Sequence, residues 1–459
     1  MEHLCKSSNK SVVELSEDII IEILHRLPSK SLARLVRVCK HWQKCIADPS
    51  LAYSCRSQRW SPHPTMIGFF CQSRVIGSEI RFLDLSSKTS SEVIDGSLDE
   101  LVNFLGRRLY IIASSNGFLL IAEKRSNQRV YYVYNPATRQ HFSVPVTETS
   151  CMKVAAIGFH CKVDDPEKDV ISFTIVRYEI WYFLRSSVTI ESFSSETNVW
   201  TTIYLTLDVP LKVCLSCYRK LASAGVIDGV FCWIDHGAQI IFYDSVNRHF
   251  WALRVNALEP WYLGVSGGVL CYASLYEGKI TMWCLESNIR SPDAVWVRKY
   301  DANLIDALRN NPPLGLVAAV MCVDIHPANP HIVYMKINGT IVSYDLEKNI
   351  MEFLYEIGDG NYLFFTYEWH QWPRTMELKK RWKTDLAKQL ERRNSANIGT
   401  QSSNKRKRPA SKVQQQKSTT NEYKNPPSLQ RYNFDFDDDM INRGCSKENL
   451  TKRESRKKM

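Results

Sequence analysis

The sequence predicts a mainly β protein with a small α-helical N-terminal domain, a β-propeller-like body of about six blades and a disordered basic C-terminal tail. Three observations support this fold class. Apolar residues recur at helical spacing near the N-terminus, and short β-type runs separated by turn residues follow to about residue 372. Beyond Asn394 the chain is rich in Ser, Gln, Lys and Asn, a composition typical of disorder. We therefore expect four parts, namely a helical domain over 12–58, a β body over 60–372, a basic amphipathic helix over 373–393 and a disordered tail over 394–459.

The N-terminal part of the chain, residues 15–48, predicts three short helices. Ser16 is a suitable N-cap for the first, and Pro28 ends it. Ser29 can cap the second, and the third is expected around 40–47. A unit of ~35–45 residues cannot bury all of these apolar faces by itself. Some of that surface must be covered by the rest of the chain or by a partner.

The β body contains a repeated pattern in which an apolar strand ends at a small polar or acidic residue and a polar turn follows. Repeats of ~40–50 residues with about four strands each are typical of propeller blades, and the mean spacing here is about 52 residues. A pair of β-sandwiches with coincidental spacing is the alternative. One amphipathic helix is expected in the body, over 301–310. The six polar landmarks are Asp84, Asn135, Ser194, Asp244, Glu286 and Asp345.

Glycine-containing pairs support the repeat because each is suited to a tight hairpin and is followed at once by apolar residues. The first three precede their landmark by 15 to 18 residues. The pairs are Asn116-Gly117, Asp228-Gly229, Gly267-Gly268 and Asn338-Gly339.

Charge and composition exclude several classes of protein. The segment 374–459 carries 23 Lys and Arg against 10 Asp and Glu, so it holds a net charge of +13 and leaves −2 for the rest of the chain. A nucleic-acid-binding body is therefore disfavoured. The longest apolar run, Leu314–Val323, is too short to cross a bilayer, and the polar N-terminus lacks a signal-peptide core. The 14 cysteines are spread along the chain, which indicates free thiols in a reducing compartment.

Two patterns resemble catalytic or metal sites, but both are better explained structurally. Gly264–Gly268 fits G-x-S-x-G, yet the residues after it continue as a strand where the nucleophile motif needs a helix. The spacing of zinc ligands is approximately met by Cys214, Cys217, Cys232 and His236, but Cys232 lies within a predicted strand and is expected to pack in the core. We therefore expect no catalytic residue, no metal site and no cofactor.

The helical segment resembles an F-box, through Leu15, Leu27-Pro28, Ser31-Leu32 and the sequence Val38-Cys39-Lys-x-Trp42. Ser16 stands where that family usually has proline. The resemblance implies docking on a Skp-family adaptor, and through it on a cullin. Carried over by position, the adaptor-binding residues would be Leu15, Ile19, Ile23, Leu24, Leu27, Pro28, Leu32, Leu35, Val38, Cys39 and Trp42.

The body is similar to the F-box-associated, kelch- or propeller-like domain of plant F-box proteins. The phrases Asn135-Pro136-Ala-Thr-Arg139 and Gly229-Val-Phe-Cys-Trp233 carry this resemblance, which covers roughly 110–290. Cys232 departs from it, since the family often has an aromatic residue there. In that family such domains present a substrate, a protein or a glycan, to the ligase.

Together these resemblances imply a non-catalytic substrate-recognition subunit of a Skp–cullin–F-box (SCF) ubiquitin ligase with a protein substrate that the sequence does not name. One alternative is a nuclear nucleic-acid-associated factor that acts through the basic tail. Another is a propeller enzyme with an accessory helical head, which would place titratable groups at one mouth of the propeller channel.

The tail contains a dense basic run, Lys405, Arg406, Lys407 and Arg408. Such a run in a disordered segment is typical of a nuclear import signal read by an import receptor; nucleic-acid contact and a merely solvated run are the alternatives. We therefore expect the protein in the nucleus, the cytoplasm or both, with no membrane association. The acidic aromatic patch Phe434–Asp439 has no assigned role.

Overall fold

The fold is described from a computed structural model of the chain. The residues that it describes are 15–27, 31–32, 35–36, 38–48, 51, 65–73, 80–85, 109–124, 128–147, 155–165, 170–213, 225–235, 239–255, 260–291, 294–310 and 320–369. The chain divides into two units, Met1–Glu377 and Leu378–Met459. The second unit lies outside the described residues, and so do the predicted helix 373–393 and the predicted tail 394–459.

The N-terminal head contains α1 (Glu17–Arg26) and α3 (Lys40–Ile46), with further helical positions between them at 31–32 and 35. Ser16 occupies the N-cap position of α1, where its carbonyl accepts from the Ile20 N–H at 3.1 Å. Its side chain makes no capping hydrogen bond. At α3 the Cys39 side chain takes the capping role and accepts from the Trp42 N–H at 3.5 Å. Apolar residues from these elements form a small core made of Ile20, Leu24, Leu32, Val36, Cys45, Ile46 and Leu51.

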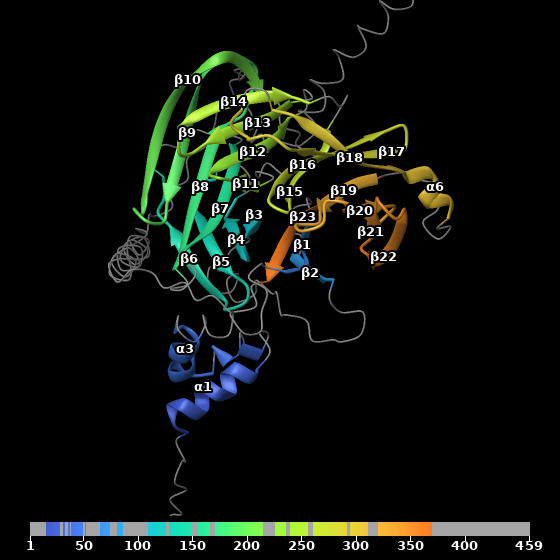
Figure 1. The fold of residues 1–459 in the computed structure, drawn as a ribbon. Coiled ribbons are helices and arrows are strands. Elements are labelled where there is room, and N and C mark those ends of the chain that lie inside the picture. The colour runs from blue at the N-terminus through green and yellow to red at the C-terminus, as the bar shows by residue number, and fades with distance from the viewer. Residues whose placement is uncertain are drawn as a thin grey trace, which may run out of the picture. The chain divides into compact units, whose positions relative to one another are not determined.

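The β body consists, in the described part of the chain, of six antiparallel sheets that follow one another along the sequence (Figure 1). Blade 1 combines both ends of the body and contains β1 (Thr65–Ser73), β2 (Ile80–Asp84) and β23 (Tyr362–Trp369). Blade 2 contains β3 (Tyr110–Ser115), β4 (Phe118–Ala122), β5 (Tyr131–Asn135) and β6 (Gln140–Val144). Blade 3 contains β7 (Ala155–Asp165), β8 (Val170–Glu179), β9 (Trp181–Ser194) and β10 (Val199–Val213).

The remaining three blades have four strands each. Blade 4 contains β11 (Gly225–Ile227), β12 (Val230–Asp235), β13 (Gln239–Asp244) and β14 (His249–Arg254). Blade 5 contains β15 (Pro260–Ser266), β16 (Val269–Tyr276), β17 (Lys279–Leu285) and β18 (Trp296–Asn303). Blade 6 contains β19 (Val320–Ile325), β20 (Ile332–Ile337), β21 (Thr340–Asp345) and β22 (Ile350–Glu356).

The six blades close into a ring. The strands β23, β3, β7, β11, β15 and β19 each contact the next in that order, and β19 contacts β23 again. These are therefore the innermost strands. The last strand, β23, pairs antiparallel with the first, β1, so that blade 1 joins the beginning and the end of the body; both lie side by side in Figure 1. The predicted six-bladed propeller is confirmed, and the sandwich pair is wrong.

The polar landmarks of the sequence lie at the end of the third strand from the axis. Five of them are the last residue of that strand, and Glu286 directly follows the third strand of blade 5. The Asp244 carboxylate accepts from the backbone N–H groups of Val246 and Asn247 at 2.9 and 3.1 Å. Asn135 and Asp345 accept from their own following turns in the same way. Such Asx-turns need a short polar side chain at their first position. For these three landmarks, the repeat seen in the sequence is thus the repeat of one turn.

The four predicted glycine pairs are all hairpin turns in which both central residues have positive φ, for example Asn116 at 51° and Gly117 at 80°. These backbone angles match the type I′ turn, whose twist suits two paired strands. Three of the pairs join the first and second strands of a blade. Asn338-Gly339 instead joins the second and third strands of blade 6, which explains why it does not share their spacing to the landmark.

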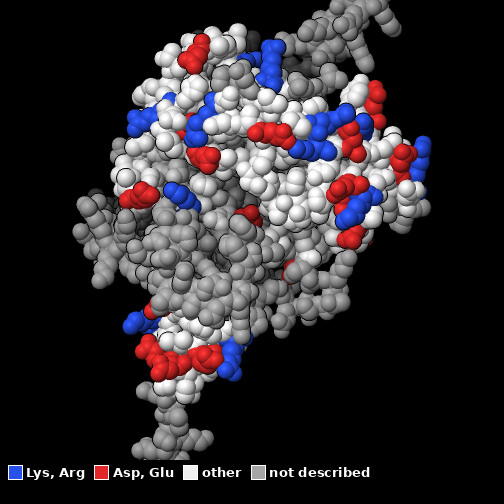
Figure 2. Space-filling view, in the orientation of Figure 1, with Lys and Arg blue, Asp and Glu red and all other residues white. Residues whose placement is uncertain are grey.

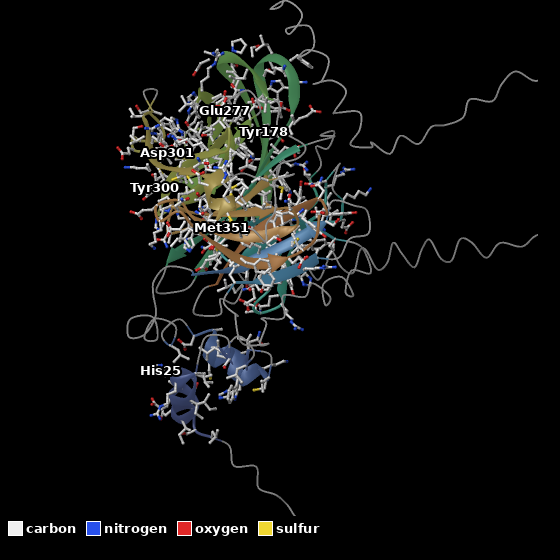
Figure 3. All side chains as sticks on the ribbon, turned by 90° about the vertical axis from the view of Figure 1, so that its right-hand side faces the viewer. His25, Tyr178, Glu277, Tyr300, Asp301 and Met351 are labelled. Carbon is white, nitrogen blue, oxygen red and sulfur yellow. The ribbon has the colours of Figure 1, made fainter. Side chains whose placement is uncertain are left out.

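The core of the propeller lies between blades. Aromatic and aliphatic side chains of adjacent sheets pack there. Tyr178 of blade 3, which Figure 3 labels, meets Trp233 of blade 4 edge to face, with 5.1 Å between the ring centroids. Between blades 2 and 3, Arg177 and Glu191 form a buried ion pair. The Arg177 guanidinium also donates to the Gln128 carbonyl. Every blade thus depends on its neighbours for burial.

One short helix, α6 (Leu304–Arg309), follows β18. It begins later than the predicted 301–310, because 301–303 still belong to the strand and Asn303 caps the helix by accepting from the Ile305 N–H at 3.0 Å. Its buried residues join the core between blades 5 and 6.

Candidate functional site

Helix α1 separates a buried side from an apolar exposed side. Ile20 and Leu24, one turn apart, point into the core of the head, with Leu24 fully buried. Ile19 is 50% exposed, and Leu15 just before the helix is 48% exposed. Ile23 lies one turn after Ile19 and is partly exposed. The helix therefore presents a second row of aliphatic side chains that the head does not cover.

The segment leading into α3 carries further exposed apolar side chains. Val38 is 63% exposed and Cys39 is exposed. Leu27, Leu35 and Trp42 are partly buried and pack on the edge of the head core. We call the exposed and partly exposed residues the apolar head face. Its members are Leu15, Ile19, Ile23, Leu27, Leu35, Val38, Cys39 and Trp42.

Two residues of the predicted adaptor-binding set differ from the others. Leu24 and Leu32 have no exposed surface and belong to the core of the head. Their position gives them a structural role, since they hold α1 against the second helical segment. Pro28 lies outside the described residues, as do Lys405, Arg406, Lys407 and Arg408. The adaptor-binding role of the set stays a prediction.

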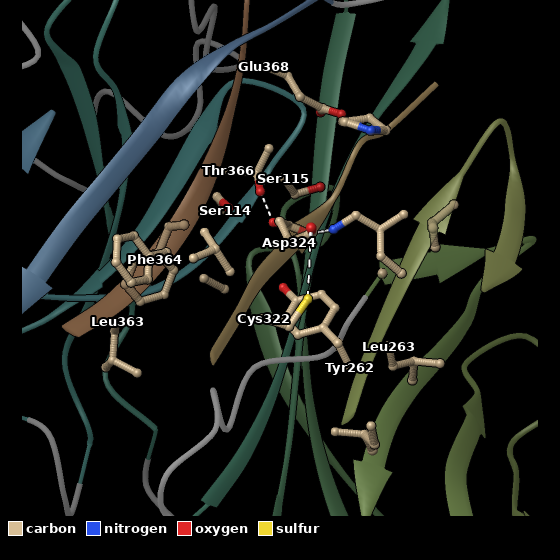
Figure 4. Close-up of a pocket in the computed structure, with 18 of the residues that line it drawn as sticks. Ser114, Ser115, Tyr262, Leu263, Cys322, Asp324, Leu363, Phe364, Thr366 and Glu368 are labelled. Carbon is tan, nitrogen blue, oxygen red and sulfur yellow. Dashed lines mark hydrogen bonds between the residues drawn. The ribbon is translucent and has the colours of Figure 1, made fainter. Parts of the chain in front are cut away.

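The propeller body contains a cavity along its axis. It has a volume of about 520 Å³ and is lined by residues of the innermost strands β3, β7, β11, β15, β19 and β23. Among the lining residues are hydroxyl, amide and carboxylate side chains, from Ser114, Ser115, Asn116, Asp324, Thr366 and Glu368. Figure 4 shows several of these side chains close together. We call this space the axial cavity.

Asp324 on β19 lies at the centre of the polar part of the axial cavity. Its carboxylate accepts from the Thr366 hydroxyl of β23 and from its own neighbour's backbone, the Ile325 N–H, at 2.9 Å. Tyr262 of β15 also shares a side-chain hydrogen bond with it. Burial, together with the Asp324 charge, raises the pKa of Tyr262 well above its ordinary value, so this hydroxyl stays protonated and donates.

Glu368 on β23 is the second carboxylate of the axial cavity. Burial raises its pKa above the ordinary value, and the nearby Asp324 charge adds to the rise, while the donating Asn116 N–H opposes it. On β7, burial lowers the pKa of His160, and Lys162 lowers it further. Titratable groups with shifted pKa values thus meet in one cavity, a pattern often found at functional sites.

Sequence reasoning did not find the axial cavity. A signal exists in β23, where Phe364, Thr366 and Glu368 occupy alternate positions on one face of the strand. That signal has meaning only once β23 is known to be innermost, and its place depends on pairing with β1 almost three hundred residues earlier.

The two catalysis-like patterns have structural roles where the structure describes them. Ser266 ends β15, its hydroxyl donates to the His326 carbonyl at 2.6 Å, and Gly267-Gly268 make a hairpin turn. Cys232 is fully buried with Val230 in one core cluster, whereas Phe231 belongs to the cluster on the other side of the sheet. Cys214, Cys217 and His236 lie outside the described residues.

Within the described ranges, no three His, Cys, Asp or Glu side chains converge as metal ligands would. Nor does any helix of those ranges have both the length and the hydrophobicity that a bilayer crossing needs. Acidic and basic side chains alternate over the face of the propeller that Figure 2 shows.

Comparisons with known proteins agree with this architecture. A family model described as F-box-like matches residues 17–56, and one described as "F-box protein At3g26010-like, beta-propeller" matches residues 88–386. The F-box protein At4g19940 of Arabidopsis thaliana is 34% identical over 374 residues, which cover 75% of this chain and 86% of that protein.

Two further Arabidopsis thaliana proteins are similar over shorter regions. F-box protein At5g03970 is 29% identical over 247 residues, which cover 50% of this chain. The matched region spans only about half (54%) of that relative's own length. F-box protein At5g49610 is 24% identical over 275 residues, 58% of this chain and 70% of that protein. The chain thus combines an F-box-like head with a β-propeller body. By its family-model matches and its relatives, the chain belongs to the F-box proteins that carry an At3g26010-like β-propeller.

Proposed function

We propose that this chain is a non-catalytic substrate-recognition subunit of an SCF ubiquitin ligase, which docks on a Skp-family adaptor through the apolar head face and presents a protein target through the propeller. The observation that carries this proposal is the exposure of Leu15, Ile19 and Val38, which are 48, 50 and 63% exposed on a head whose own core is already filled. A cluster of aliphatic side chains left uncovered on so small a unit is typical of a protein–protein interface.

The mechanism is positional. The adaptor holds the chain, and through it the target, near the ubiquitin-conjugating enzyme, so that transfer becomes effectively intramolecular. Burying one large aliphatic side chain contributes ~1.5–3 kcal/mol. The half-exposed members of the apolar head face therefore supply enough free energy for a stable interface after the costs of association.

Adaptor docking is tested with Ile23→Asp and Leu27→Asp in the full chain co-expressed with a Skp-family adaptor. Each variant places a carboxylate in an interface that excludes water, so we expect adaptor co-purification to be lost. Glu22→Gln, an exposed change on the same helix, is the matched control and should co-purify as the wild type does. Undiminished co-purification of both Asp variants would contradict the docking surface.

Target presentation is tested by affinity purification of the full chain with the proteasome blocked. A target held by the propeller should be enriched with the wild type and with Ile23→Asp alike, but should carry ubiquitin only with the wild type. A protein that is lost together with the adaptor is not a propeller target.

A second candidate function, that of a propeller enzyme, is favoured by the axial cavity, where Glu368 and His160 have shifted pKa values. The propeller-enzyme alternative expects titratable groups in the channel, and this cavity contains them. Its polar and apolar lining residues suit the binding of a small ligand.

A further inference from the structure

The axial cavity has a polar part and an apolar part. In Figure 4 the polar part contains Thr366, Ser115 and Asp324, with Glu368 at its edge. The apolar part lies around Leu363 and Phe364. A volume of about 520 Å³ falls within the ~300–1,000 Å³ of ordinary small-ligand pockets. The cavity therefore matches a ligand with one polar end and one apolar end.

The sign of charge in the axial cavity is one-sided. Its lining residues in the described part of the chain include the carboxylates of Asp324 and Glu368 but neither lysine nor arginine. The Lys336 ammonium lies 5.5 Å from the Tyr362 ring centroid and donates to the Gly360 carbonyl at 2.7 Å. It is not among the lining residues.

Glu368 is the carboxylate on which the inference depends most. Its charged form is disfavoured by burial and by the neighbouring Asp324, and a neutral donor, the Asn116 N–H, offsets this in part. A cation placed beside it would stabilise the charged form, and Coulomb attraction is several times stronger in such a cavity than in water. An anionic ligand would meet repulsion instead.

We propose that the axial cavity binds a group with an aliphatic stem and a terminal ammonium or guanidinium, with the cation beside Glu368 and Asp324 and the stem against Leu363 and Phe364. Two sources share this chemistry, a free aliphatic amine and the lysine or arginine side chain of a peptide. The inference does not depend on adaptor docking, because the cavity lies wholly within the propeller.

The experiment measures binding of n-pentylamine to the full chain by calorimetry, with n-pentanol as the neutral ligand of the same length. For the wild type we expect Kd on the order of 1 mM for the amine, since six heavy atoms supply about 4 kcal/mol. We expect the alcohol to bind at least tenfold more weakly. In Glu368→Gln the amine should bind at least tenfold more weakly than in the wild type.

The matched control is Glu356→Gln, an exposed carboxylate on β22 outside the cavity lining, which should bind the amine as the wild type does. Since burial already favours neutral Glu368, the Gln variant should keep the thermal midpoint of the wild type. Amine affinity should also fall as the pH is lowered through the raised pKa of Glu368. The other titratable groups that line the same cavity are Asp324, Tyr262 and His160. Equal binding of amine and alcohol, equal binding by the two Gln variants, or no binding to the wild type would each overturn the proposal.

Two further ligands distinguish the sources. Spermidine represents a free aliphatic amine, and an acetylated, amidated peptide with one central lysine represents a protein segment. A tighter Kd for spermidine assigns the cavity to a small molecule. A tighter Kd for the peptide, lost when its lysine is replaced by norleucine, assigns it to a target side chain.

Discussion

Replacement of Asp244 by asparagine should weaken the propeller in a way that depends on pH. Asp244 ends the third strand of blade 4 and is almost fully buried. It accepts from the turn that follows and from the Asn247 side chain, and the Arg290 guanidinium of blade 5 donates to it at 2.6 Å. The carboxylate therefore fixes a turn and joins two blades at once.

The magnitude follows from the pKa of Asp244, which is lowered from 3.8 to about 2. Burial acts against this change, and the hydrogen bonds from Arg290, Asn247 and Val246 outweigh it. A difference of this size between folded and unfolded chain corresponds to roughly 2–3 kcal/mol at neutral pH. Because the Arg290 side chain is 31% exposed, solvent screens part of the interaction, and we expect about 2 kcal/mol.

The sign of the pH dependence follows from the lowered pKa. The contribution is fully present above the unfolded pKa of 3.8 and is lost as pH falls through the folded value of about 2. At pH 3 roughly half of it should remain. Asp244→Asn cannot ionise, so its stability difference from the wild type should shrink as the pH is lowered from 7 to 3.

The assay is urea unfolding followed by tryptophan fluorescence at pH 7, 5 and 3, with the exposed Asp359→Asn as the matched control. Asp244→Asn should lower the free energy of unfolding by about 2 kcal/mol at pH 7 and by about 1 kcal/mol at pH 3. A loss below about 0.5 kcal/mol at pH 7, or an equal loss at both pH values, would refute the reasoning.

Three other predictions concern the head, a thiol pair and the tail. Leu24→Ala should lower the free energy of unfolding by ~2–5 kcal/mol and increase hydrogen exchange throughout α1 and α3, because Leu24 is fully buried. Ile19→Ala should leave hydrogen exchange unchanged. Similar exchange in both variants would contradict the division of α1 into two sides. Cys271 and Cys284 lie directly opposite each other on β16 and β17, with their Sγ atoms 2.7 Å apart. Hydrogen peroxide should therefore take one hydrogen from each thiol, so that a disulfide forms and the peroxide is reduced to water. A peptide mass without that loss of two hydrogens would disprove the pairing. Alanine at all four positions of 405–408 should move a fluorescent fusion from nucleus to cytoplasm, and an unchanged distribution would remove the proposed import signal.

The propeller could be predicted from the sequence because its repeat is local. Asn135 and Asp345 each fix a turn through bonds to residues two and three positions later, so the signal lies within a few residues. The glycine pairs act over an equally short range, since positive φ at both central residues is a property of the turn itself. Turns of this kind can therefore be recognised from short sequence patterns.

The axial cavity could not be predicted because ring closure defines it. Nothing near Glu368 or Asp324 in the sequence indicates that β23 and β19 are innermost, as this follows from contacts between distant blades. The sequence does not separate the buried from the exposed head residues, for a related reason. The family resemblance places Leu24 in the same adaptor-binding set as Ile19, but only the packing of the second helical segment, through Leu32, shows which of them is buried.

The pairing of β23 with β1 has a consequence for how the chain is made. While a ribosome synthesises the protein, blades 2 to 6 can assemble in order, but β1 must wait with an open edge until Tyr362–Trp369 has been translated. A message cut short before residue 362 would yield a product whose ring cannot shut, and whose unpaired strand edge invites aggregation. Such a truncated product would still carry the N-terminal head, so that truncation separates the head from a closed propeller.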